Sequence, residues 1–163
     1  MFLGGLDAKT EEEKRDLLDL LMRYNKYFLG AETRVCMTTK TNAVVAAFDN
    51  PNDAMRCAER YLFVLGNLYV QAYVAITWAM ATIRHNRADG SGELLADSIG
   101  LAARLEPFAK SGEVLVLEEI RSHAATDRSR FEFVRVSRKW RRDVDHTSKG
   151  IDAPCYLVKV RQP

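Results

Sequence analysis

The stretch DSIGLAARLEPFAKSGEVLV, residues Asp97–Val116, decides the fold expected of this chain. Its apolar residues from Ile99 to Phe108 recur near the 3.6-residue period of an amphipathic helix, with Arg104 near the middle. Ser111-Gly112 supplies a stop signal for that helix. The apolar run Val114–Leu117 then predicts a short buried strand. The stretch therefore predicts a helix that feeds directly into the core of a sheet.

The rest of the chain alternates strand-like runs with amphipathic helices. Thr10 and Glu13 have the spacing of a capping box, and the helix that they open ends at Gly30. Asn50-Pro51 is a typical helix start, and Gly66-Asn67 a typical end. Strands are expected over residues 1–6, 33–39, 43–48, 70–83, 114–117, 131–136 and 156–160, with a polar loop over 85–92 and helices beginning at 10, 51, 97 and 118.

This order reads β-α-β-β-α-β followed by α-β-α-β-β. Its first six elements are the split β-α-β arrangement of ferredoxin-like sheets, with helices packed on one face. We therefore expect an α+β fold, an α/β sandwich, in which a βαββαβ core carries extra C-terminal helices and strands. The 163 residues are enough for one domain with a real core, expected to span residues 1–163.

Composition excludes several classes of protein. The 24 basic and 22 acidic side chains leave a net charge of only +2, which provides no overall attraction to nucleic acid or to an anionic membrane. The longest apolar run, residues 73–83, is too short to span a bilayer, and the N-terminus lacks the pattern of a secretory signal. We expect a cytoplasmic protein that binds neither nucleic acid nor membrane.

Cysteine and histidine usage points to no metal or disulfide framework. Cys36, Cys57 and Cys155 are widely spaced in apolar contexts, which predicts small buried side chains rather than disulfides. The three histidines have no zinc-site spacing. The basic cluster over 138–142, with its single tryptophan, is expected to be a solvated hairpin or the rim of a nucleotide pocket.

Three segments, in this order along the chain, resemble the catalytic domain of class III nucleotidyl cyclases. They are AVVAAFDNPNDAMRCAERY over residues 43–61, AARLEPFAKSGEVLV over 102–116, and Lys149-Gly150-Ile151 followed by Pro154 and a strand. The order of predicted elements is also that of the cyclase domain. The resemblance implies the class III cyclase fold for nearly the whole chain.

The resemblance also implies a chemistry, which needs two divalent cations. Cyclases of this class direct the ribose 3′-hydroxyl onto the α-phosphate of a nucleoside triphosphate, and two aspartates hold the metals. The aligned positions here are Gly4 and Asn42. Asp7 is a possible substitute ligand, although an acidic residue just before a helix start is favoured by the helix dipole alone. As aligned, the two-metal site is absent.

The remaining family positions are partly retained. Arg104 aligns with the arginine that stabilises charge on the transferred phosphate, whereas Gly100 replaces the asparagine that orients the ribose, one helical turn away. An alternative role for Arg104 is a salt bridge across a dimer interface. The positions that select the purine align with Cys36 and Glu93, and Glu93 is equally consistent with a solvated surface carboxylate. The candidates for the phosphate-contacting lysine are Lys139 and Lys149.

The substitutions at Gly4, Asn42 and Gly100 favour a non-catalytic cyclase-homology domain that dimerises and acts in regulation or nucleotide binding. In that case we expect no cofactor. The alternative is an active or weak adenylate or guanylate cyclase with a relocated metal site, which would need Mg²⁺ or Mn²⁺. Either function implies a homodimer or a heterodimer with a cyclase-like chain, and a nucleoside triphosphate as the candidate ligand.

Overall fold

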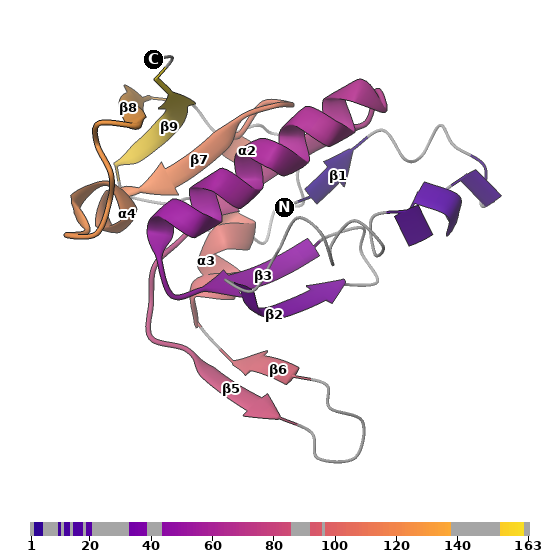
Figure 1. Cartoon of the computed structure of the whole chain (residues 1–163), viewed down its shortest axis with the longest axis horizontal. Coiled ribbons are helices and arrows are strands. Elements are labelled where there is room, and N and C mark those ends of the chain that lie inside the picture. The colour runs from indigo at the N-terminus through magenta and orange to yellow at the C-terminus, as the bar shows by residue number, and fades with distance from the viewer. Residues whose placement is uncertain are drawn as a thin grey trace.

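The computed structural model describes residues 2–4, 10, 12–13, 15–17, 19–20, 33–38, 44–85, 92–95, 97–137 and 154–161. Its centre is a five-stranded mixed sheet in the order β1-β4-β7-β9-β8 (Figure 1). Only the β4–β7 pair is parallel. The strands are β1 (Phe2–Gly4), β4 (Gln71–Ile76), β7 (Val114–Leu117), β9 (Cys155–Val160) and β8 (Phe131–Val136).

Helices cover both faces of this sheet because the central strands are apolar on both sides. In β7 all four side chains are buried. Val114 and Val116 pack with Met55 of helix α2 (Pro51–Asn67) on one face. Leu115 and Leu117 pack with Leu105 of helix α3 (Asp97–Leu105) on the other. The period-2 alternation of a strand thus assigns each residue to one layer. The α+β fold class is confirmed, but the expectation that the helices pack on one face of the sheet is wrong, because β7 is buried on both faces.

Two of the predicted helix starts are confirmed in atomic detail. The Thr10 N–H donates to Glu13 Oε2 at 2.7 Å, and the Glu13 N–H donates to Thr10 Oγ1 at 3.2 Å, which is a complete capping box. Asn50 Oδ1 accepts the N–H of Asn52 at 2.9 Å, with Pro51 as the first residue of α2. Local sequence therefore fixes where both helices begin.

Helix α2 ends with a tyrosine at the position where most helices have a glycine. The Val70 N–H donates to the Leu65 carbonyl at 2.9 Å, and the Tyr69 N–H donates to the Gly66 carbonyl at 3.1 Å, which together form a Schellman motif. Glycine is the usual left-handed residue of this motif. Here that residue is Tyr69, with a φ of +55° and a side chain that is 95% exposed. The backbone at this turn is therefore strained.

The prediction of one long strand over residues 70–83 is wrong. The run divides into β4 and β5 (Thr82–His85), with a linker over residues 77–81 between them. The predicted polar loop over 85–92 contains the start of β6 (Gly92–Leu95), which pairs antiparallel with β5. The linker is exposed beyond Thr77, so its apolar alternation does not reflect a covered strand. Figure 1 shows the β5–β6 hairpin projecting away from the sheet.

The other helices and strands lie close to the ranges predicted from the sequence. The hairpin of β2 (Thr33–Thr38) and β3 (Val44–Phe48) forms as predicted, as a two-stranded sheet of its own. The predicted helix over 97–108 ends earlier, at Leu105, and a 3-10 turn over Glu106–Phe108 follows, with a proline at its start. The short helix α4 covers Glu118–Ser122. None of the helices in the described ranges has the length and apolar composition needed to cross a bilayer.

Candidate functional site

Helix α3 places two of the predicted site positions on an exposed surface. Gly100 and Arg104 are both exposed, one helical turn apart. Arg104 Nε donates to the Gly100 carbonyl at 3.3 Å, so the guanidinium lies along its own helix. A Cβ at Gly100 would meet no atom within 4 Å. Packing therefore does not require glycine at the position where the family carries asparagine.

The predicted metal positions offer a poor set of ligands. Gly4 ends β1, paired with Gln71 of β4, and has no side chain to ligate a cation. Asn42 and Asp7 lie outside the described residues. Within the part that the structure describes, no group of three or more His, Cys, Asp or Glu side chains is placed to hold a metal ion. A two-carboxylate metal site therefore does not fit the residue at the end of β1.

The two positions aligned with purine selection lie on neighbouring strands. Cys36 is on β2, opposite Ala46 of β3, and Glu93 is on β6, opposite Arg84 of β5. Strands β2 and β6 are in contact, so the backbone brings these two positions to one region. Lys139, Lys149 and the basic cluster over 138–142 lie outside the described residues.

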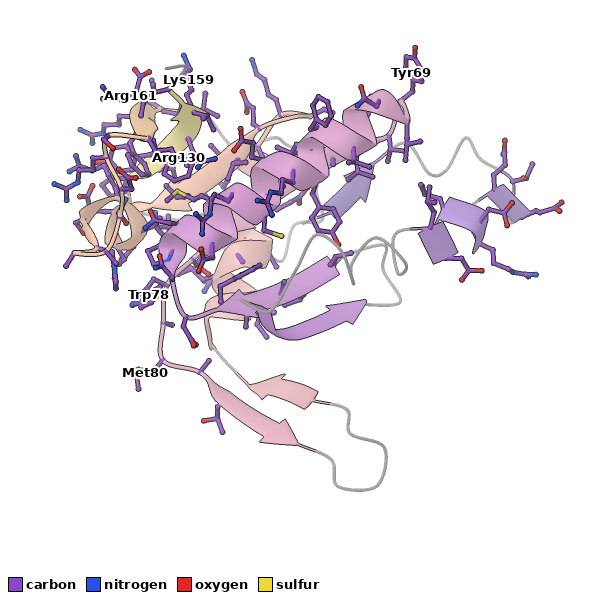
Figure 2. All side chains as sticks on the ribbon, viewed as in Figure 1. Tyr69, Trp78, Met80, Arg130, Lys159 and Arg161 are labelled. Carbon is purple, nitrogen blue, oxygen red and sulfur yellow. The ribbon has the colours of Figure 1, made fainter. Side chains whose placement is uncertain are left out.

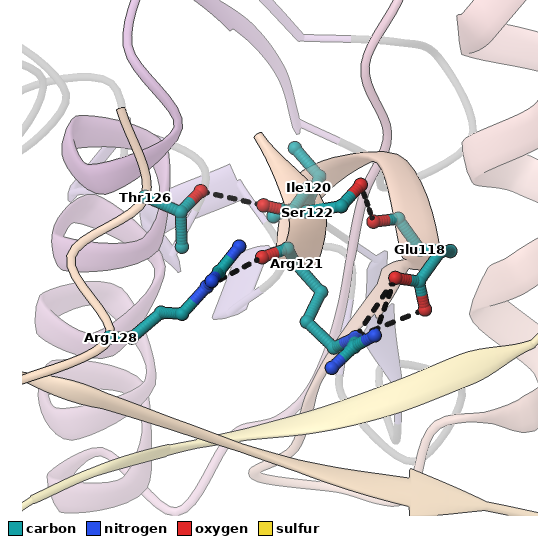
Figure 3. Close-up of polar contacts among 6 residues, drawn as sticks. All are labelled: Glu118, Ile120, Arg121, Ser122, Thr126 and Arg128. Carbon is teal, nitrogen blue, oxygen red and sulfur yellow. Dashed lines mark hydrogen bonds and ion pairs between the residues drawn. The ribbon is translucent and has the colours of Figure 1, made fainter. Parts of the chain in front are cut away.

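The sequence patterns did not single out a polar cluster on α4 (Figure 3), which also contacts Tyr156 of β9. Arg121 donates to Glu118 through Nε at 3.0 Å and through a terminal nitrogen at 2.7 Å. The Arg121 guanidinium also lies over the Tyr156 ring, 4.9 Å from its centroid. Arg128 Nε donates to the Arg121 carbonyl at 3.3 Å. The three-residue spacing of Glu118 and Arg121 in a helix was the available signal.

This cluster has defined electrostatics. The hydrogen bonds from Arg121 and then from Tyr156 lower the pKa of Glu118 below its ordinary value. The same contact with Glu118 raises the pKa of Arg121, and the hydrogen bond to Glu118 raises the pKa of Tyr156. Each shift favours the charge state in which these contacts form: an ionised Glu118, an ionised Arg121 and a protonated Tyr156. They hold α4 against the sheet rather than presenting a free charge to a ligand.

Solved structures show what this arrangement is similar to. The guanylyl cyclase domain of the RhoGC fusion protein from the aquatic fungus Blastocladiella emersonii matches with a TM-score of 0.74 and 13% identity, over 99% of this chain and 93% of that one. An adenylate cyclase from Trypanosoma brucei matches with a TM-score of 0.68 and 16% identity, over 95% and 81% of the chains. This chain has the class III nucleotidyl cyclase fold.

A third solved structure has the same fold. An adenylate/guanylate cyclase/hydrolase from Silicibacter pomeroyi superimposes with a TM-score of 0.61 and 17% identity, over 93% of this chain and 89% of that one. No protein-family model matches the chain, and no curated protein matches it. The similarity to these proteins is therefore one of fold, at sequence identities of 13–17%.

Proposed function

We propose that this domain is a non-catalytic member of the class III cyclase fold, which pairs with a second copy or with a cyclase-like chain and acts as a regulatory or nucleotide-binding module. The observation that carries the proposal is the exposed pair on α3. Arg104 is retained, but Gly100 supplies no side chain to the ribose position although nothing within 4 Å crowds it.

The electrostatic requirements of the reaction support the same proposal. Transfer of a phosphoryl group needs its developing charge to be stabilised, and each well-placed charge is worth several kcal/mol of barrier. Gly4 supplies no charge at the end of β1, and Asn42 supplies an amide rather than a carboxylate. A domain with these residues keeps a surface for a nucleotide without the means to turn it over.

The second candidate is an active or weak cyclase with a relocated metal site. The retained arginine on α3 and the neighbouring strands that carry Cys36 and Glu93 favour it. Asp7 is the nearest carboxylate in sequence to the end of β1 and is the residue on which this candidate depends.

One experiment separates the two candidates. The purified chain is incubated with ATP, GTP, CTP or UTP and Mn²⁺, and both cyclic product and nucleotide binding are measured. The proposal predicts no cyclic product with any of the four nucleotides. Product formation that Asp7→Asn abolishes would support the relocated metal site and overturn the proposal.

A further inference from the structure

The basic residues of this chain are unevenly distributed. The whole sequence carries a net charge of only +2, yet residues 128–142 hold seven basic side chains and a single acidic one, Glu132. Lys159 and Arg161 follow near the C-terminus, where no acidic residue occurs after Asp152. The expectation that the chain binds no nucleic acid used the net charge of the whole chain, which does not describe this part of it.

The β8–β9 pair brings several of these cations to one edge of the central sheet. Strand β8 is the outermost strand and pairs antiparallel with β9 along its six residues. The Arg161 N–H donates to the Arg130 carbonyl at 2.8 Å, which places these two residues side by side at one end of the pair. Figure 2 shows Arg130, Lys159 and Arg161 together at this end. Arg135 lies near the other end, directly opposite Tyr156.

Three of these cations have no acidic partner among the described residues. Arg135, Lys159 and Arg161 are exposed, and no described carboxylate forms an ion pair with them. Arg130 has a long contact with Glu59, at 3.7 Å, between side chains that are 45% and 42% exposed. Because so exposed a pair contributes little, an incoming anion can compete for Arg130.

The spacing of the cations fits an extended anion rather than a single phosphate. A strand rises about 3.4 Å per residue, so the ends of β8 near Arg130 and Arg135 are about 17 Å apart. Alternation places Arg135 on the face of the sheet where Phe133 packs towards α2, and Lys159 on the face where Leu157 packs towards α3. A ligand that contacts both must follow the edge between the two faces.

The sequence directly after β8 adds an aromatic ring to the cations. Residues 138–142 are Arg-Lys-Trp-Arg-Arg. Stacking of bases on aromatic rings, beside cations that contact phosphates, is how proteins bind single-stranded nucleic acid without reading its sequence. Binding to a membrane surface gains from apolar side chains that insert, but the large ones that the described residues expose all lie between Phe63 and Met80, outside β8 and β9. An acidic protein would use the cations without the tryptophan.

We propose that the β8–β9 edge, together with the basic segment over 138–142, binds single-stranded nucleic acid. The exposed cations of the edge contact phosphates along the strand, and Trp140 supplies the ring on which a base stacks. The site includes neither α3 nor Arg104. It therefore goes beyond the proposed function and does not depend on it.

Salt-dependent binding tests the role of the cations. The purified full chain is titrated into fluorescent oligo-dT or oligo-U of about 15 nucleotides, and fluorescence anisotropy is followed at several salt concentrations. We expect micromolar binding that weakens as salt rises, because contacts with phosphates release counterions. Arg135→Gln combined with Lys159→Gln should weaken binding about tenfold or more and reduce the slope of log K against log salt by about 1.4. The tighter oligonucleotide indicates whether RNA or DNA is the preferred form.

A matched variant separates a local site from the general effect of charge. Arg15→Gln combined with Arg60→Gln removes the same charge from the N-terminal helix and from α2. This variant should bind both oligonucleotides as the native chain does. Because the four substituted side chains are exposed, both double variants should keep the native melting temperature.

The tryptophan distinguishes nucleic acid from other anions. Trp140→Ala should weaken binding to either oligonucleotide about tenfold, because one stacked base is lost. The same variant should bind inorganic polyphosphate, which has no bases, as the native chain does. Trp140→Phe keeps an aromatic ring and should restore most of the affinity for the oligonucleotides.

Three results would overturn this proposal. The first is no binding to either oligonucleotide at low salt, and the second is an equal loss of affinity in the two double variants. The third is binding to phosphatidylserine vesicles or to polyglutamate without binding to the oligonucleotides, which would assign the edge to a membrane or to an acidic protein. Detection of cyclic product would overturn the proposed function instead and leave the nucleic-acid site intact.

Discussion

Arg104 donates from Nε to the carbonyl of Gly100 at 3.3 Å, one turn back on the same helix. In the class III cyclases that the sequence resembles, the aligned positions carry arginine and asparagine side chains that meet one nucleotide. Here the second position offers only its backbone. The contact is exposed and leaves the guanidinium accessible. The surface of α3 therefore keeps the positive charge of Arg104 but has no amide side chain beside it.

The open space above Gly100 predicts that asparagine is tolerated there. Gly100→Asn should raise the free energy of unfolding by up to about 0.5 kcal/mol, because asparagine has the higher helix propensity and nothing within 4 Å obstructs it. Urea denaturation measures the change. Gly112→Ala is the contrasting control, since Gly112 has a φ of +81° and should lose about 1 kcal/mol. A destabilised Gly100→Asn chain would mean that glycine is required structurally.

The strained turn after α2 predicts a stabilising substitution. Tyr69→Gly should raise the free energy of unfolding by about 1 kcal/mol, because glycine adopts the left-handed conformation without steric cost. The phenol contributes little to packing, since it is 95% exposed. Asn67→Gly, within the helix, is the control and should destabilise by a few tenths of a kcal/mol. Loss of stability in Tyr69→Gly would contradict the assignment of strain.

Asn52 links the start of α2 to the loop after α4. Its Nδ2 donates to the Ala125 carbonyl at 2.6 Å, and its Oδ1 accepts the Asp127 N–H at 2.8 Å. Asn52→Ala removes both bonds and should cost about 1–2 kcal/mol in urea denaturation. Asn67→Ala, an exposed position at the other end of α2, should be close to neutral. Equal effects of the two substitutions would show that the long-range bonds contribute nothing.

The Glu118–Arg121 pair predicts a pH dependence of stability. Because the pKa of Glu118 is lowered in the folded state, its contribution is present above the unfolded pKa, about 4.3 for glutamate, and is lost as the pH falls through the folded pKa. The native chain should therefore lose stability below about pH 4 more steeply than Glu118→Gln. Urea denaturation at several pH values measures the slopes. The exposed neighbour Glu119→Gln is the control and should follow the native curve.

The sequence predicted those elements whose signals are local. The Thr10–Glu13 capping box and the start of α2 at Pro51 depend on side chains within three residues of the helix end, and both are confirmed. The run Val114–Leu117 is a strand with the predicted bounds and is buried throughout, and its short length after Ser111-Gly112 is what distinguished it from a helix. Distant contacts were not needed for these predictions.

The predictions that are wrong or incomplete concern segments whose structure depends on contacts between residues far apart in the chain. The alternation of residues 70–83 is the same in β4 and in the exposed linker, and only the pairing of β5 with β6 shows where the sheet ends. At the site, spacing alone placed Gly100 and Arg104 on one helix surface. The contact of Arg121 with Tyr156 joins residues far apart in the chain, so no local pattern indicates it.

The central claim is that this cyclase fold has lost its chemistry, and the most direct measurement is cyclic nucleotide formation by the native chain beside Arg104→Ala. With each of the four nucleoside triphosphates and Mn²⁺, the account predicts no product above background from either protein. Because Arg104 is exposed, the variant should fold normally. Product from the native chain that Arg104→Ala abolishes would contradict the account.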